Sequence, residues 1–164
     1  MATDLPVPIE FRLPDGWHAA SPDEAGLPNV AFVALNAATH GSGFTANITI
    51  DGEVRGDGAS LAEIADESVT GLRDAAPTVT VAHRADLGVG AAPGLAQDIR
   101  ITLRDGAVRE LVQSQVYLTV PDATDSTRRA VVRAALTVAL DQVDTVIDDF
   151  REFLASIRLD TDRR

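Results

Sequence analysis

Apolar and polar residues alternate over residues 44–50, which read Phe-Thr-Ala-Asn-Ile-Thr-Ile. Since successive side chains of a strand point to opposite faces, this pattern predicts a strand with one apolar face and one hydrogen-bonding face. Thr45, Asn47 and Thr49 are expected on the hydrogen-bonding face. The same division recurs in later segments, so the chain is predicted to build a sheet whose two faces differ in kind.

Other alternating or continuous apolar runs predict further strands. These runs cover residues 9–13, 30–35, 78–85, 99–103 and 108–120. Asp105-Gly106 separates the last two and is a strong hairpin signal. Residues 51–58 and 88–94 are rich in glycine and are expected to be loops. Residues 130–140 fit a strand by their alternation and a helix by their alanines, so both interpretations stay open.

Two segments have the apolar spacing of an amphipathic helix. Ser60 and Glu63 form a capping-box pattern, so a helix is expected to begin at Ser60, with Gly71 and Pro77 marking its exit. A second helix is expected over residues 141–156, where acidic residues lie opposite an apolar stripe. Helices combined with antiparallel strands in this order predict an α+β sandwich.

Length and composition fit one globular domain. The chain has 164 residues, of which 45% are hydrophobic and 24% charged, and it contains no cysteine. A domain of this size buries enough surface to fold without disulfides or metals. We expect an extended arm at residues 1–8, a single domain at 9–160 and a flexible tail at 161–164.

Charge and hydropathy bear on partners and location. The net charge of −11 repels nucleic-acid phosphates and anionic lipids, so neither is expected as a partner. All basic residues are arginine, and they are scattered along the chain. The N-terminus does not read as a signal peptide, and no apolar run approaches the length of about 18 residues that a membrane span needs. These features predict a cytoplasmic protein.

Several strings of the sequence resemble one family. They are Ile-Glu-Phe-Arg-Leu-Pro-Asp-Gly-Trp at 9–17, residues 44–50, the helix start at Ser60, Leu-Val-Gln-Ser-Gln-Val-Tyr-Leu-Thr at 111–119 and Phe-Arg-Glu-Phe-Leu-Ala-Ser-Ile at 150–157. Together they resemble bacterial PsbP-like proteins of the Mog-type fold, nearest the actinobacterial LpqN-like and DcrB-like proteins. The resemblance implies an α/β/α-type sandwich with a central antiparallel sheet and packed helices. It also makes residues 130–140 a strand.

The sequence offers no motif for a metal or a cofactor, and none is expected. His18, His40 and His83 lie in three different predicted elements and lack the i, i+4 pairing of a helical zinc site. Residues 88–94 resemble a dinucleotide loop only superficially, because Pro93-Gly94 breaks the glycine pattern and a strand follows.

The hydrogen-bonding face of the predicted sheet is the candidate binding site. Strand parity assigns to it Asn47, Thr49, Arg100, Thr102, Gln113, Gln115 and Tyr117. These side chains either contact a partner, face solvent or lie beneath a polar helix edge. If they contact a partner, the two glutamines face water in the free protein and contribute little to its stability. Trp17 is expected to fill the core rather than to bind a ligand.

The predicted function is that of a small non-catalytic binding or accessory protein, LpqN-like, acting through protein–protein contact. One alternative is a cytoplasmic chaperone or adaptor for a secretion-system substrate, as the DcrB-like effector chaperones are. Another is a small hydrolase or isomerase that uses a sheet cleft, where Arg100 and Tyr117 would polarise a carbonyl but no partner base accompanies them. A protein partner is expected, and a homodimer stays open.

Overall fold

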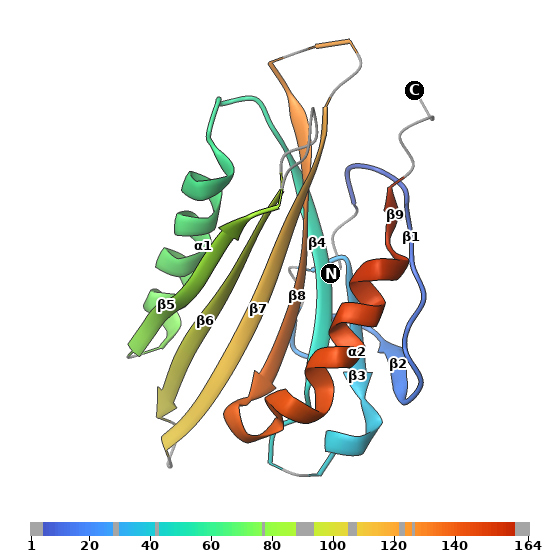
Figure 1. Cartoon of the computed structure of the whole chain (residues 1–164), viewed down its shortest axis with the longest axis vertical. Coiled ribbons are helices and arrows are strands. Elements are labelled where there is room, and N and C mark those ends of the chain that lie inside the picture. Colours follow the sequence, from blue (N-terminus) through green and yellow to red (C-terminus); the bar gives the residue numbers. More distant parts are fainter. Residues whose placement is uncertain are drawn as a thin grey trace.

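The computed structural model describes residues 5–27, 30–41, 43–76, 78–87, 94–104, 108–121, 124, 125 and 127–159. Within these residues, seven strands form one antiparallel sheet (Figure 1). Its order is β2 (Trp17–Ala20), β3 (Phe32–Asn36), β4 (Asn47–Arg55), β8 (Arg129–Ala139), β7 (Val108–Pro121), β6 (Gly94–Arg104) and β5 (Thr78–Asp86). Helix α1 (Leu61–Ala75) and helix α2 (Val143–Ser156) complete the α+β fold that the sequence predicts.

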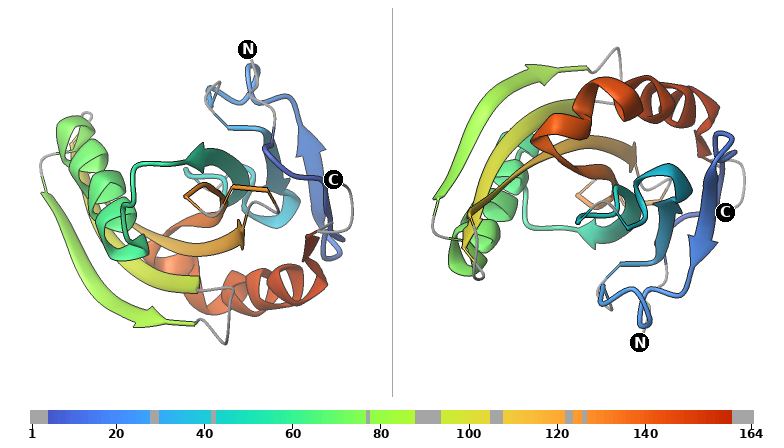
Figure 2. Two further views of the ribbon diagram at one scale, coloured as in Figure 1. Left: turned by 90° about the horizontal axis from the view of Figure 1, so that it is seen from above. Right: turned by 90° about the horizontal axis from the view of Figure 1, so that it is seen from below.

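The two helices lie on opposite faces of the sheet. Figure 2 shows the sheet curving around α1, with α2 against its other side. Short 3-10 helices, Ala37–Thr39 and Leu140–Gln142, follow β3 and β8. Neither α1 nor α2, the α-helices of the described residues, is long and apolar enough to cross a membrane.

The face toward α2 is an apolar core. Ile48, Ile50, Val132, Ala134, Leu136 and Val138 of the sheet pack there against Val146, Phe150 and Phe153 of α2. Phe11 lies edge-on to Phe153, with ring centroids 5.3 Å apart. Trp17 is buried, as predicted, and its Nε1 donates a hydrogen bond to Asp149 Oδ2 at 2.9 Å. The indole therefore fills the core while its polar atom is satisfied.

Helix α1 covers the opposite face through two apolar clusters. Near its start, Leu61, Ile64 and Ala65 contact Leu95, Tyr117 and Val131. Toward its end, Val69, Leu72 and Ala76 contact Val79, Ile99, Ile101 and Leu111. The predicted capping box is confirmed, because Ser60 Oγ accepts from the Glu63 amide and Glu63 Oε1 accepts from the Ser60 amide. Gly71 lies inside the helix and does not end it.

Three predicted boundaries are wrong at the start of the chain and in β4. Only Ile9–Glu10 of residues 9–13 forms a strand, β1, which pairs with β9 (Arg158–Leu159). Beyond it, the Arg12 backbone hydrogen-bonds to the Ser156 hydroxyl, so a side chain replaces a strand neighbour. β4 begins at Asn47 rather than Phe44, and it continues through residues 51–55, which the sequence assigned to a loop. Pairing with β8 along all of β4 extends this strand.

The later elements agree better with the sequence. β6 begins at Gly94, earlier than predicted, because residues 94–98 pair with β7. β6 and β7 form the predicted antiparallel pair, with Arg104 opposite Val108, although Asp105-Gly106 itself lies outside the described residues. Residues 88–93 of the predicted loop also lie outside them. The segment at residues 130–140, which fits both a strand and a helix by its sequence, forms strand β8 as far as Ala139. This confirms the strand that the family resemblance implies.

We expect Phe150→Ala to lower the free energy of unfolding by about 3–5 kcal/mol. The side chain is 2% exposed between α2 and the sheet, so its loss removes buried apolar area and leaves a cavity. Urea denaturation measures the effect. Glu152→Ala, at an exposed position of the same helix, is the control and should change stability by less than about 0.5 kcal/mol. A loss below about 1 kcal/mol for Phe150→Ala would contradict the packing of α2.

Candidate functional site

A row of side chains, all polar except that of Ala135, crosses the sheet beneath α1. The strand register places Thr49, Ala135, Gln115, Gln97 and Arg84 opposite one another on β4, β8, β7, β6 and β5. Gln97 Nε2 donates to Gln115 Oε1 at 2.7 Å, and Arg84 Nη2 donates to Gln97 Oε1 at 2.7 Å. Gln97 is 1% exposed and Gln115 0%. The row therefore runs from the edge strand into the interior.

Gln115 is the centre of this network. Its Oε1 also accepts a hydrogen bond from the Tyr117 hydroxyl at 2.9 Å. Its Nε2 donates to Ser68 Oγ of α1 at 2.9 Å and to Gln113 Oε1 at 2.6 Å. Among the described residues, every buried side-chain nitrogen or oxygen has a hydrogen-bond partner. The network is closed on itself and joins α1 to the sheet.

Arg133 of β8 extends the network toward β4. It forms a two-point ion pair with Asp51, with Nη2 2.6 Å from Oδ2 and Nε 3.2 Å from Oδ1, and its Nη1 donates to Ser68 Oγ at 2.9 Å. Burial lowers the pKa of Arg133, but Asp51 and Tyr117 outweigh it, so the pKa is raised overall. The guanidinium stays charged and holds α1 at Ser68.

Five of the seven predicted binding residues lie together on the α1 face of the sheet. They are Asn47, Thr49, Gln113, Gln115 and Tyr117. Strand parity is therefore right for β4 and β7. The expectation that both glutamines face water is wrong for Gln115, because α1 covers it and Ser68 binds it. Asn47 is partly buried, and its Nδ2 donates to the Thr45 carbonyl at 3.3 Å.

Arg100 and Thr102 lie on the opposite face of the sheet, so grouping them with the other five is wrong. Arg100 lies opposite Val112 in the register, and its half-exposed side chain is 3.7 Å from Glu110. The reason is that Leu95, Ile99 and Ile101 of β6 face α1 together with Gln97, so the alternate residues of this strand face the other way. Sequence reasoning missed Gln97 because it began this strand at residue 99.

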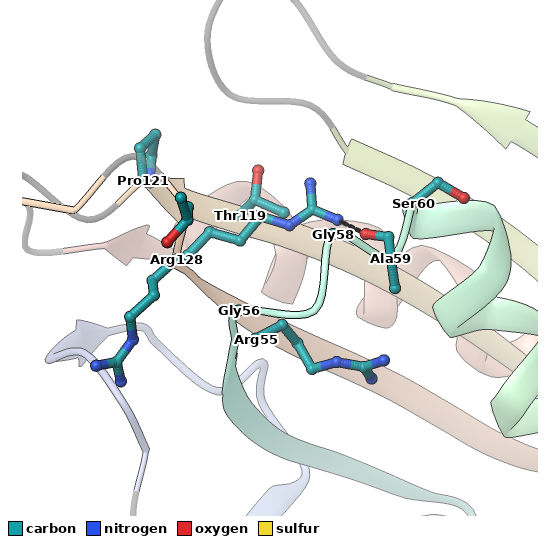
Figure 3. Close-up of a pocket in the computed structure, with 10 residues that line it drawn as sticks. Arg55, Gly56, Gly58, Ala59, Ser60, Thr119, Pro121 and Arg128 are labelled. Carbon is teal, nitrogen blue, oxygen red and sulfur yellow. Dashed lines mark hydrogen bonds between the residues drawn. The ribbon is translucent and has the colours of Figure 1, made fainter.

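One end of the sheet opens into two hollows, where β4 leads into α1 and β7 leads into β8. The first has a volume of about 580 Å³ and is shown in Figure 3. Its walls are Arg55, Gly56, Gly58, Ala59, Ser60, Thr119, Pro121, Thr127, Arg128 and Arg129. The second, of about 370 Å³, lies beside the Arg133–Asp51 pair. We call the first the arginine hollow, because three arginines line it.

Three carboxylates of the chain pair with Arg55, so the cluster as a whole carries negative charge. The guanidinium of Arg55 lies 2.8 Å from Glu53, 2.7 Å from Asp57 and 2.9 Å from Glu67. The hydrogen bond from Arg55, assisted by the Ala59 amide, lowers the pKa of Asp57 to about 2. The Arg55 hydrogen bond also lowers the pKa of Glu67, while the three carboxylates raise the pKa of Arg55. This cluster fastens the end of β4 to α1.

The other two arginines of the hollow keep their charge available. Arg129 Nη2 donates to the carbonyl oxygen of Ala59, which is neutral (dashed line in Figure 3). Arg128 is exposed, and Figure 3 shows its side chain extending away from Arg55. Among the described residues, the arginines in ion pairs are Arg55, Arg84, Arg100, Arg133 and Arg151. The hollow therefore presents two guanidinium groups that form no ion pair among the described residues, on a chain whose net charge is −11.

Sequence reasoning also missed the arginine hollow. Arg128-Arg129 is a visible pair in the sequence, but nothing local connects it to Arg55. Only the β4–β8 register, in which Arg55 lies opposite Arg129, brings them together.

Solved structures share this fold. LpqN of Mycobacterium tuberculosis, involved in cell envelope biogenesis, matches with a TM-score of 0.66 and 11% identity, covering 94% of this chain and 85% of that one. Cyanobacterial PsbP (CyanoP) of Synechocystis sp. PCC 6803 matches with a TM-score of 0.62 and 16% identity, covering 92% and 86%. The Ran-binding protein Mog1p of Saccharomyces cerevisiae matches with a TM-score of 0.56 and 12% identity, covering 92% and 89%.

These matches confirm the predicted resemblance at the level of the fold, which is the Mog1p/PsbP-like fold. No protein-family model matches the sequence, and no curated protein matches it. The site must therefore be interpreted from its own geometry.

We expect Gln115→Ala to lower the free energy of unfolding by about 2–3 kcal/mol, because it leaves the buried Gln97 amide and the Tyr117 hydroxyl without their shared acceptor. Gln113→Ala, on the same strand but only partly buried, is the matched control and should cost about 1 kcal/mol or less. Denaturant midpoints compare the two variants. Equal and small effects would mean that the network does not stabilise the fold.

We expect Asp57 to titrate near pH 2 in the native chain and closer to its ordinary value of 3.8 in Arg55→Ala. Because folding lowers this pKa, the interaction stabilises the fold above pH 3.8, and the contribution is lost as the pH falls toward 2. The carboxyl chemical shift of Asp57, followed by NMR while the chain stays folded, measures both values. Arg151→Ala, which removes an exposed ion pair elsewhere, should leave the titration unchanged.

Proposed function

We propose that this chain is a small binding or accessory protein that acts through contact with another protein at the arginine hollow. The observation that carries the proposal is an open hollow with two guanidinium groups that form no ion pair among the described residues, on a strongly acidic chain. The fold supports the proposal, since Mog1p, which has the same fold, is a Ran-binding protein.

The buried polar row is a poorer contact surface than the hollow. Gln97 and Gln115 form their hydrogen bonds with each other, with Tyr117 and with α1. A partner would have to displace α1 to reach them and would leave these groups unpaired, which is costly. The row stabilises the fold, and recognition falls to the side chains of the arginine hollow at the end of the sheet.

The walls of the hollow have the mixed chemistry of a protein interface. Pro121 and Ala59 offer apolar surface, Thr127 offers a hydroxyl, and Arg128 and Arg129 offer guanidinium groups. Arginine is enriched at interfaces and among the residues that dominate binding energy, since one side chain supplies apolar area and several hydrogen-bond donors. A protein surface can satisfy all of these groups together.

Site-specific photo-crosslinking in cells of the source organism tests the proposal. A benzophenone amino acid replaces Pro121 in one variant and Val108 in another. Pro121 is an exposed apolar residue at the wall of the hollow, and Val108 is the matched control, because it is an exposed apolar residue at the other end of the same strand, β7. We expect a covalent adduct with a different protein from position 121 and none from position 108.

Three results would contradict the proposal. They are no adduct at position 121, the same adducts at both positions, and an adduct only with a second copy of this chain. Mass spectrometry of the crosslinked species separates the last result from the expected one.

A further inference from the structure

We propose that the arginine hollow takes an acidic peptide segment of the partner, whose carboxylates pair with Arg128 and Arg129. This inference rests on the proposed function and specifies the chemistry of the partner. It depends on the charge, order and size of the hollow.

Two guanidinium groups of the hollow are available to carboxylates of a partner. Arg55 is already paired with three carboxylates of the chain, whereas Arg128 and Arg129 form no ion pair among the described residues. A guanidinium pairs with a carboxylate through two parallel hydrogen bonds, which adds both strength and direction. Because the chain as a whole is strongly acidic, an acidic segment is repelled by most of its surface and finds charge partners at these two arginines.

The guanidinium of Arg129 and the stem of Arg128 are positioned before a ligand arrives. The bond to the Ala59 carbonyl uses one of the several N–H donors of Arg129 and holds its guanidinium at the wall of the hollow. The stem of Arg128 lies against Gly56, where an added Cβ would be 3.3 Å from Arg128 Cγ. Side chains that are already ordered lose less conformational entropy on binding.

The size and walls of the hollow favour a peptide over a small anion. Its volume of about 580 Å³ lies in the range of sites that hold ligands far larger than one ion. The start of α1 is a poor site for phosphate, because the capping box already occupies the amides of Ser60 and Glu63 and the Glu63 carboxylate adds negative charge. Pro121 and Ala59 add apolar wall area that an inorganic anion cannot use.

Fluorescence anisotropy with labelled hexaglutamate tests the inference, with labelled hexaglutamine as the uncharged probe. We expect the native chain to bind hexaglutamate and not hexaglutamine, and to bind more weakly as salt is added. Arg128→Glu should weaken binding by about tenfold or more, because it removes one guanidinium and adds a like charge. Arg104→Glu makes the same charge change at the far end of the sheet and should alter affinity by less than about twofold.

Other outcomes would overturn the inference. If Arg104→Glu weakens binding as much as Arg128→Glu does, the binding reflects overall charge and not the hollow. If hexaglutamate does not bind, the hollow does not take an acidic segment. Displacement of hexaglutamate by an equal concentration of inorganic phosphate would assign the hollow to small anions. If hexaglutamate fails while crosslinks at position 121 persist, the proposed function stands and only the chemistry of the partner is wrong. If the crosslinks are also absent, the proposed function fails as well.

Discussion

The arrangement of this protein depends on the need to pair buried amide groups between α1 and the sheet. Gln97 and Gln115 lie where no water reaches them, and an unpaired amide there would cost about 1–3 kcal/mol. Their partners on the helix are the Ala65 carbonyl and the Ser68 hydroxyl. The apolar clusters on either side of this row tolerate small shifts, but the hydrogen bonds do not. The row therefore sets the position of α1 along the sheet.

Different interactions hold the helix on each face of the sheet. Against α2, the core consists of aliphatic side chains and the rings of Phe150 and Phe153, and non-directional burial stabilises it. Against α1, hydrogen bonds fix the position of the helix. The Arg133–Asp51 pair and the Arg55 cluster extend these directional contacts toward the end of the sheet where the arginine hollow lies. Because those bonds place the start of α1, they also shape the hollow between it and the β7–β8 connection. The function that we propose thus depends on the network indirectly.

Local patterns predicted much of the fold. The capping box at Ser60 and the apolar stripe of α2 depend on residues a few positions apart, so the sequence displays them directly. Strand ends were less accurate, because β4 extends through Asp51 only where β8 supplies Arg133 as a partner. Such a partner is many residues away and leaves no local signal.

Parity along each strand was determined by the sequence itself, because side chains alternate whatever the neighbours are. That is why Asn47 and Thr49 share a face, as do Gln113, Gln115 and Tyr117. Which face a helix covers was decided only by the tertiary structure, so polar residues were buried on β7 and exposed at Arg100 on β6. The meeting of Arg55 with Arg129 likewise required the β4–β8 register. Strand order and helix coverage arise from the total burial and hydrogen bonding of distant segments, which no single segment encodes.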